Sequence, residues 1–240
     1  MKALKLTATI AFLCSFTFAA EPQKKDVDLK AEDGTNLKAS YFSPGRPGPG
    51  PAILLLHQCN MDRHAWDGLA QDLAKAGFHV LTFDFRGFGE SGGARGPANP
   101  APERQKWPSD VDTAYAYLLK QQGVNIERVM AGGASCGVTQ ASDLATRHRE
   151  VKALMLLSGS ASDAAKGYLS GTPSVAVFGA ASEGDTNAAK GIREAVESSK
   201  NPRSKLKIYS GTEHGVPMFA KNPELEPMIV DWLRAEVGSL

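Results

Sequence analysis

Short apolar runs alternate with stretches of helical periodicity from residue 52 to near the end of the chain, and this alternation constrains the fold more than any other feature. The apolar runs lie at residues 52–57, 79–83, 128–131, 151–157, 174–178 and 206–209, and the helical patterns at 65–76, 109–120, 136–147, 187–198 and 225–237. A strand that is apolar along its whole length is buried on both faces. Its alternation with helices predicts a mostly parallel, doubly wound α/β sheet covered by helices on both faces. In such sheets the ligand site lies at the carboxyl ends of the strands.

The segment before this alternation predicts an antiparallel hairpin. Residues 26–31 and 37–42 are typical of two strands, and Glu32–Thr35 supplies the turn between them. A connector rich in proline and glycine, residues 43–51, follows and is too short to separate two domains. We therefore expect about eight strands in a single domain that covers residues 21–240.

The first twenty residues have the pattern of a secretory signal peptide. Lys2 and Lys5 give a basic start, residues 6–18 carry no charge, and Ala19 or Ala20 offers a small residue for cleavage. The apolar run is too short for a helix that spans a membrane, and no later run of the sequence is long enough either. The sequence therefore predicts an exported protein, periplasmic or secreted, with no stable membrane anchor.

The charge balance argues against a nucleic-acid-binding protein. Lys and Arg number 27 and Asp and Glu number 26, which gives a formal net charge of +1. Loss of the two leader lysines would lower the net charge to −1. Nucleic-acid binders carry a basic face, and we expect no nucleic-acid partner here.

A G-x-S-x-G motif, Gly133-Ala134-Ser135-Cys136-Gly137, lies between a predicted strand and a predicted helix. In this context the motif forms a sharp turn that lifts the serine hydroxyl above the sheet, and bulkier residues at the glycines would clash. The N–H groups that begin the next helix can bind a developing oxyanion. Ser135 is therefore the predicted nucleophile. The alternative is a glycine-rich turn whose serine only caps the helix.

A serine hydroxyl needs a base, and His214 is the best placed of the five histidines. It follows the predicted strand at residues 206–209 by a short loop, which puts it at the carboxyl edge of the sheet and late in the chain. The other histidines, His57, His64, His79 and His148, lie at less suitable ends of strands or on helices.

The base needs an orienting carboxylate, placed between nucleophile and histidine in chain order. Glu183 and Asp185 both follow the predicted strand at residues 174–178. We favour Asp185 because Asp is the commoner acid of such triads, and Glu183 remains the rival. Asp163 fits less well. Either acid of the favoured loop could instead be a surface residue at the start of the next helix.

An oxyanion hole needs two backbone N–H donors. Cys136, directly after the nucleophile, is one candidate, and Gln58, directly after the predicted strand at residues 52–57, is the other. These two loops must approach each other for both donors to reach one oxygen. Cys59 and Cys136 lie in the same two loops, and cysteines of exported proteins often pair. We therefore hypothesise a Cys59–Cys136 disulfide, with two buried free thiols as the alternative.

Together these residues resemble the α/β-hydrolase superfamily, and most closely its dienelactone-hydrolase-like branch. The resemblance runs from about residue 27 to the C-terminus and rests on four segments in the family's order, Leu56–Asn60, Asp84–Ser91, Gly133–Gly137 and His214–Gly215. It implies the α/β-hydrolase fold, with an N-terminal antiparallel hairpin. Gln58 stands where a glycine is common, and true dienelactone hydrolases have a cysteine at the position of Ser135. Residues 159–173 leave little room for an inserted lid, so we expect no large cap domain.

The predicted activity is hydrolysis of carboxylic esters of small or medium size through an acyl-enzyme. Ser135 would attack, His214 would act as the base, and Asp185 would orient the imidazole. Neither a metal nor an organic cofactor is implied, and the expected partner is a small-molecule ester. Alternatives are an amidase or peptidase with the same triad, a hydrolase with Cys136 as the nucleophile, and an exported binding protein that keeps the fold without turnover.

Overall fold

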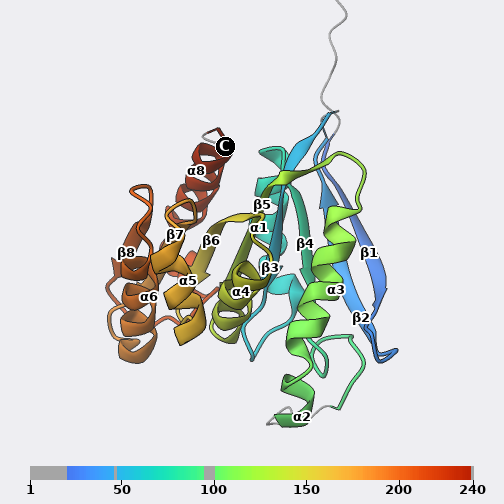
Figure 1. The fold of residues 1–240 in the computed structure, drawn as a ribbon, viewed down its shortest axis with the longest axis horizontal. Coiled ribbons are helices and arrows are strands. Elements are labelled where there is room, and N and C mark those ends of the chain that lie inside the picture. Colours follow the sequence, from blue (N-terminus) through green and yellow to red (C-terminus); the bar gives the residue numbers. More distant parts are fainter. Residues whose placement is uncertain (1–20, 46–47, 95–100, 239–240) are drawn as a thin grey trace, which may run out of the picture.

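The computed structural model describes residues 21–45, 48–94 and 101–238, and the predicted leader lies outside these residues. One sheet of eight strands has the order β1-β2-β4-β3-β5-β6-β7-β8, with β1 at the right of Figure 1 and β8 at the left. The strands are β1 (Gln23–Lys30), β2 (Asn36–Ser43), β3 (Gly50–Leu56), β4 (His79–Phe83), β5 (Val124–Ala134), β6 (Val151–Leu157), β7 (Ala176–Ser182) and β8 (Lys205–Tyr209). β2 pairs antiparallel with β1 and β4, and all the other pairings are parallel. The predicted mostly parallel sheet with an N-terminal antiparallel hairpin is confirmed.

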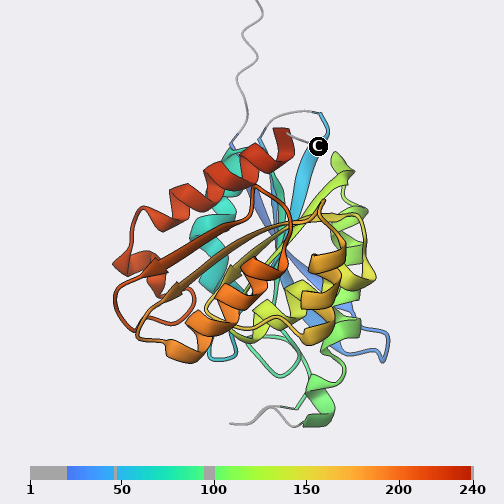
Figure 2. The ribbon, with the colours of Figure 1, turned by 60° about the vertical axis from the view of Figure 1, so that its left-hand side comes forward.

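Helices cover both faces of this sheet. They are the 3-10 helix η1 (Arg63–Trp66), followed by α1 (Asp67–Lys75), α2 (Ala101–Arg104), α3 (Trp107–Leu119), α4 (Cys136–Arg147), α5 (Asp163–Gly171), α6 (Thr186–Ser198), α7 (Met218–Lys221) and α8 (Leu225–Gly238). Buried residues of α3, α4, α5 and α6 share one hydrophobic cluster, and those of α1, α7 and α8 share the other. Figure 2 shows α1 and α8 on one side of the sheet and α3 to α6 on the opposite side.

The apolar sequence of β3 follows from its place between these two layers. Ile53 and Leu55 belong to one hydrophobic cluster, while Leu54 and Leu56 belong to the other. Successive side chains of a strand point to opposite faces, so a central strand covered on both sides needs apolar residues at every position.

Two parallel strands, β5 and β7, end later in the sequence than the pattern predicts, and both of these ends lie at the site. β5 spans residues 124–134 instead of 128–131, and β7 spans 176–182 instead of 174–178. Both strands continue through small residues, glycine and alanine, which carry little strand signal but fit a crowded parallel sheet. As a result β5 runs directly into Ser135, and only two residues separate the end of β7 from Asp185.

The segment at residues 159–173, expected to be too short for a cap, contains α5. Ser162 caps the start of this helix by accepting a hydrogen bond from the Ala165 N–H. The helix packs against α4 and α6, so it belongs to the helical layer of the sheet. Within the part of the chain that is described, no helix is long and apolar enough to cross a membrane.

Candidate active site

Ser135 occupies a strained turn between β5 and α4. Its backbone φ is +53° and ψ is −118°, a conformation that residues with a side chain rarely adopt. A Cβ on Gly133 would lie 2.1 Å from the Gly137 carbonyl oxygen, and a Cβ on Gly137 would lie 2.3 Å from the Leu56 carbonyl oxygen. Both glycines of the motif are therefore required by close backbone contacts, as the sequence pattern predicts.

The end of β6 supports this turn. The Ser135 N–H donates to the Leu157 carbonyl oxygen at 2.9 Å. A Cβ on Gly159 would lie 2.6 Å from the Ser135 carbonyl oxygen, so a third glycine allows the loop after β6 to approach the turn. Ser135 itself is half-buried and lies at the carboxyl edge of the sheet.

His214 and Asp185 form a direct pair. The Nδ1 atom of His214 lies 2.5 Å from Oδ2 of Asp185, which fits an imidazole N–H that donates to the carboxylate. Asp185 stands at the N-cap position of α6, yet its side chain makes no capping hydrogen bond. Glu183, the rival acid, is exposed. The carboxylate of Asp185 thus serves the histidine, and Nε2 of His214 remains for another partner.

The loop between β8 and α7 that carries His214, here called the histidine loop, lies next to the end of β5. The hydroxyl of the buried Ser182 donates to the Glu213 carbonyl oxygen at 2.7 Å, which ties this loop to the end of β7. On the other side of the histidine, a Cβ on Gly215 would lie 3.4 Å from Cβ of Ala134. Since Ala134 directly precedes Ser135, the loop that carries His214 contacts the end of the nucleophile strand.

His57 orders the loop after β3, a role that the sequence analysis did not assign to it. Its Nε2 accepts the Phe85 N–H at 3.0 Å, so the proton of a neutral ring lies on Nδ1 and is donated to the Gln58 carbonyl oxygen at 2.8 Å. Burial lowers the pKa of His57, which favours this neutral form. The backbone around Gln58 is therefore fixed from beneath by a buried side chain.

A disulfide joins Cys59 and Cys136, whose Cα atoms lie 5.9 Å apart. The bond links the loop after β3 to the first residue of α4. Gln58 and Cys136, the two candidate oxyanion donors, are thus next to or part of this cross-link. The first N–H groups of a helix have no partner within the helix, so the Cys136 N–H is free of helical hydrogen bonds.

The Asp84–Ser91 segment packs beneath the site as a buried polar network. The carboxylate of Asp84 accepts the Arg63 backbone N–H at 2.7 Å and the Glu90 N–H at 2.9 Å, and it forms an ion pair with the Arg63 guanidinium at 2.5 Å. Asp84 is fully buried, and Arg63 is 3% exposed. These contacts fix the turn after β4, from which Phe85 reaches His57, so the segment has a structural role.

The remaining histidines and the third acid lie away from this constellation. His79 begins β4, and His64 and His148 pair with the carboxylates Asp67 and Asp112. Asp163 is the first residue of α5 and its side chain is 99% exposed. Among the described residues, no group of three or more His, Cys, Asp or Glu side chains is arranged to hold a metal ion.

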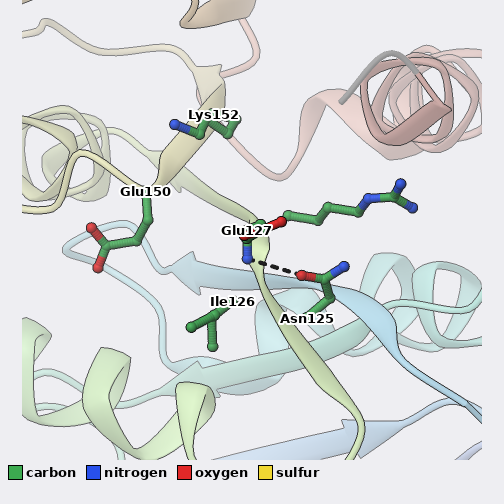
Figure 3. Close-up of a pocket in the computed structure, with 6 residues that line it drawn as sticks. Asn125, Ile126, Glu127, Glu150 and Lys152 are labelled. Atoms are coloured by element: carbon green, nitrogen blue, oxygen red, sulfur yellow. Dashed lines mark hydrogen bonds between the residues drawn. The ribbon is translucent and has the colours of Figure 1, made fainter.

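A surface hollow lies at the opposite edge of the sheet, where β5 and β6 begin (Figure 3). Its lining residues are Asn125, Ile126, Glu127, Arg128, Glu150 and Lys152. Figure 3 shows the Glu127 N–H donating to the Asn125 side chain, a local contact that shapes the strand start. None of the lining residues is Ser135, His214 or Asp185, so this hollow lies apart from the candidate active site.

The architecture and the site define the class of protein. The profile of the alpha/beta hydrolase fold family matches residues 51–180, which is more than half of the chain. The chain therefore belongs to the α/β-hydrolase family. The matched region contains the loop after β3, the turn at Ser135 and most of the parallel sheet.

Individual relatives share parts of this sequence or the whole fold. An uncharacterized protein of Mycobacterium tuberculosis is 34% identical over 137 residues, 57% of this chain and 46% of that protein. An uncharacterized protein of Escherichia coli is 31% identical over 129 residues, 51% of this chain and 42% of that protein. The chain thus spans less than half the length of these curated relatives.

Solved structures extend the likeness of the fold beyond the matched region. A Pyrococcus furiosus esterase has a TM-score of 0.69 at 18% identity, covering 90% of this chain and 93% of the esterase. An alpha/beta hydrolase from a Penicillium species has a TM-score of 0.70 at 16% identity, covering 90% of this chain and 99% of that protein. At these identities the likeness establishes the fold alone.

Proposed function

We propose that this protein is a serine hydrolase that cleaves carboxylic esters of small or medium size. The observation that carries the proposal is the 2.5 Å contact between His214 and Asp185. The loop that carries His214 packs against the end of β5, and the strained Ser135 directly follows this strand. A strained serine, a histidine and a carboxylate in this chain order are what nucleophilic acyl transfer requires. A protein that only binds a ligand has no need of all three.

In the proposed reaction the Ser135 hydroxyl oxygen attacks the ester carbonyl carbon. Nε2 of His214 takes the hydroxyl proton, and Asp185 stabilises the resulting imidazolium. The carbonyl oxygen becomes an oxyanion, held by the N–H groups of Gln58 and Cys136. Collapse of this intermediate expels the alcohol, which takes the proton from His214, and leaves an acyl group on Ser135.

Water then completes the cycle. His214 removes a proton from the attacking water molecule, and a second oxyanion forms in the same hole. Its collapse releases the carboxylic acid and returns the proton to Ser135. Apart from the ester and one water molecule, the proposed reaction uses only side chains and backbone groups of this chain.

The test compares the wild type with Ser135→Ala on p-nitrophenyl acetate, butyrate and octanoate, with a fluorophosphonate probe in parallel. We expect wild-type turnover and labelling, and a loss of kcat/KM of at least about 10³-fold in Ser135→Ala. Ser170→Ala, the same change on exposed α5, is the matched control and should behave as the wild type. A folded wild type that neither reacts with the probe nor cleaves any ester would contradict the proposal. Cleavage of amides without cleavage of esters would instead favour an amidase that uses the same three residues.

Export is part of the proposal, with the chain cleaved near Ala19 or Ala20 and active in the periplasm or outside the cell. The Cys59–Cys136 disulfide supports this location, because disulfides persist in oxidising compartments. Expression of the full chain in a bacterium, followed by mass measurement of the periplasmic and culture fractions, tests it. A full-length mass found only in the cytoplasmic fraction would contradict export.

A further inference from the structure

The side chain of Gln58 is 1% exposed, although it lies in a loop at the active-site edge. Long polar side chains are seldom buried so completely unless hydrogen bonds hold them. The mechanism proposed above uses only the backbone N–H of this residue. The burial of the amide group therefore calls for a separate explanation.

The amide of Gln58 connects two loops. One is the loop between β3 and η1 that carries Gln58, here called the oxyanion loop, and the other is the histidine loop. Its Oε1 accepts the Val216 backbone N–H at 2.9 Å. Its Nε2 donates to Oδ1 of Asn60 at 2.8 Å and lies at the longer distance of 3.5 Å from the His214 carbonyl oxygen. One side chain thus contacts the backbone of His214 and the backbone two residues later.

Gly215 shows how tightly the histidine loop passes over this amide. Its φ is +69°, and a Cβ at this position would lie 2.2 Å from Oε1 of Gln58. A residue with a side chain would therefore displace either the loop or the amide. The glycine and the glutamine are complementary, and together they set how closely the histidine loop approaches the end of β5.

The histidine loop is anchored from two directions. Ser182 holds the residue before His214 through the Glu213 carbonyl, and Gln58 holds the residues after it. The Asp185 contact fixes the imidazole from one end only, because it engages Nδ1. The position of Nε2 relative to Ser135 therefore depends on the backbone that Gln58 holds.

We infer that the side chain of Gln58 is a positioning residue for the reaction, which fixes the His214 loop against the oxyanion loop so that base, nucleophile and oxyanion donors keep one geometry. This inference rests on the proposed function. It gives Gln58 two separate roles, since the backbone N–H stabilises the oxyanion while the amide aligns the base. A displacement of about 1 Å in such an arrangement lowers a rate by about 10²-fold.

The test uses Gln58→Met and Gln58→Glu, with Gln122→Glu as the matched control on an exposed residue before β5. Gln58→Met keeps the approximate length and volume but loses the hydrogen bonds of the amide to Val216, Asn60 and His214. We expect kcat to fall by about 10- to 10²-fold while KM changes by less than about threefold, because the base is misaligned and the substrate pocket is kept. The rate of fluorophosphonate labelling should fall by the same factor as kcat.

Gln58→Glu tests rescue by a conservative variant. Burial favours the neutral carboxylic acid at this place, and the neutral acid can accept the Val216 N–H and donate its O–H as the amide does. The kcat of Gln58→Glu should therefore lie closer to the wild type than that of Gln58→Met, and Gln122→Glu should behave as the wild type. Circular dichroism and urea unfolding of each variant establish that it is folded.

Two outcomes would overturn the inference. One is a folded Gln58→Met with kcat within twofold of the wild type. The other is a folded Gln58→Glu with a kcat no higher than that of Gln58→Met, which would show that the hydrogen bonds of this side chain do not position the base. Both outcomes presuppose an active wild type and an inactive Ser135→Ala, so failure of the inference is distinguishable from failure of the proposed function.

Discussion

The Cys59–Cys136 disulfide offers a perturbation whose effect can be worked out from the chain itself. The two cysteines are 77 residues apart in the sequence, and the bond closes a loop that contains β4, α3 and β5. A variant in which both cysteines are alanine removes the bond without leaving a free thiol. Reduction of the wild type removes the same bond without changing any other side chain.

The loss of stability follows from the loop that the bond closes in the unfolded chain. The chain-entropy relation gives about 4.5 kcal/mol at 25 °C for a loop of this size, the upper end of what removing a native disulfide costs. A domain of typical stability, about 5–15 kcal/mol, remains folded after this loss. With a urea slope of about 3 kcal/mol per M, the unfolding midpoint should fall by about 1.5 M.

Urea unfolding followed by circular dichroism measures this midpoint in the oxidised wild type, the reduced wild type and the double variant. The two proteins without the bond should agree, and reductant should leave the double variant unchanged. Ester turnover should also fall in both, by less than the roughly 10²- to 10³-fold cost of losing one oxyanion donor. Two free thiols in the unfolded, unreduced protein, or equal midpoints for oxidised and reduced wild type, would refute the reasoning.

Three further predictions concern the acid, a buried ion pair and a buried histidine. Asp185→Asn should lower kcat by about 10³- to 10⁴-fold in ester kinetics, whereas Glu183→Gln should stay within twofold; equal losses would contradict the assignment. Asp84→Asn leaves Glu90 as the remaining ion-pair partner of buried Arg63 and should cost about 1.5–3 kcal/mol in urea unfolding. A loss under about 1 kcal/mol would argue against a desolvated Asp84–Arg63 pair. Burial lowers the pKa of His57, so below about pH 6.5 the unfolded chain takes up a proton that the folded protein does not. The free energy of unfolding should therefore decrease as the pH is lowered below about 6.5, by up to about 1.4 kcal/mol per pH unit. A His57 ring NMR signal that titrates at about pH 6.5 or above would contradict this account.

The sheet was predictable because its central strands must be apolar on both faces. Alternating apolar runs and helical patterns indicated the class of fold, and the glycines around Ser135 indicated the turn between β5 and α4. The helix α5 was missed because it is short, contains Gly167 and Gly171, and buries only Ala165 and Leu169. Its helical state depends on the neighbouring helices that it packs against.

The sequence alone determined which residue types were available at the carboxyl edge of the sheet and in which order. Chain order and local motifs sufficed to predict Ser135 and His214 as candidates, since each lies directly after a strand or a short loop. Only the tertiary structure shows which acid contacts the imidazole: β7 continues to Ser182, Asp185 pairs with His214, and Glu183 is exposed. The contact of Gln58 with the histidine loop joins residues 158 positions apart. No local pattern encodes such a contact, since it exists only when two loops from distant strands meet above the same edge of the sheet.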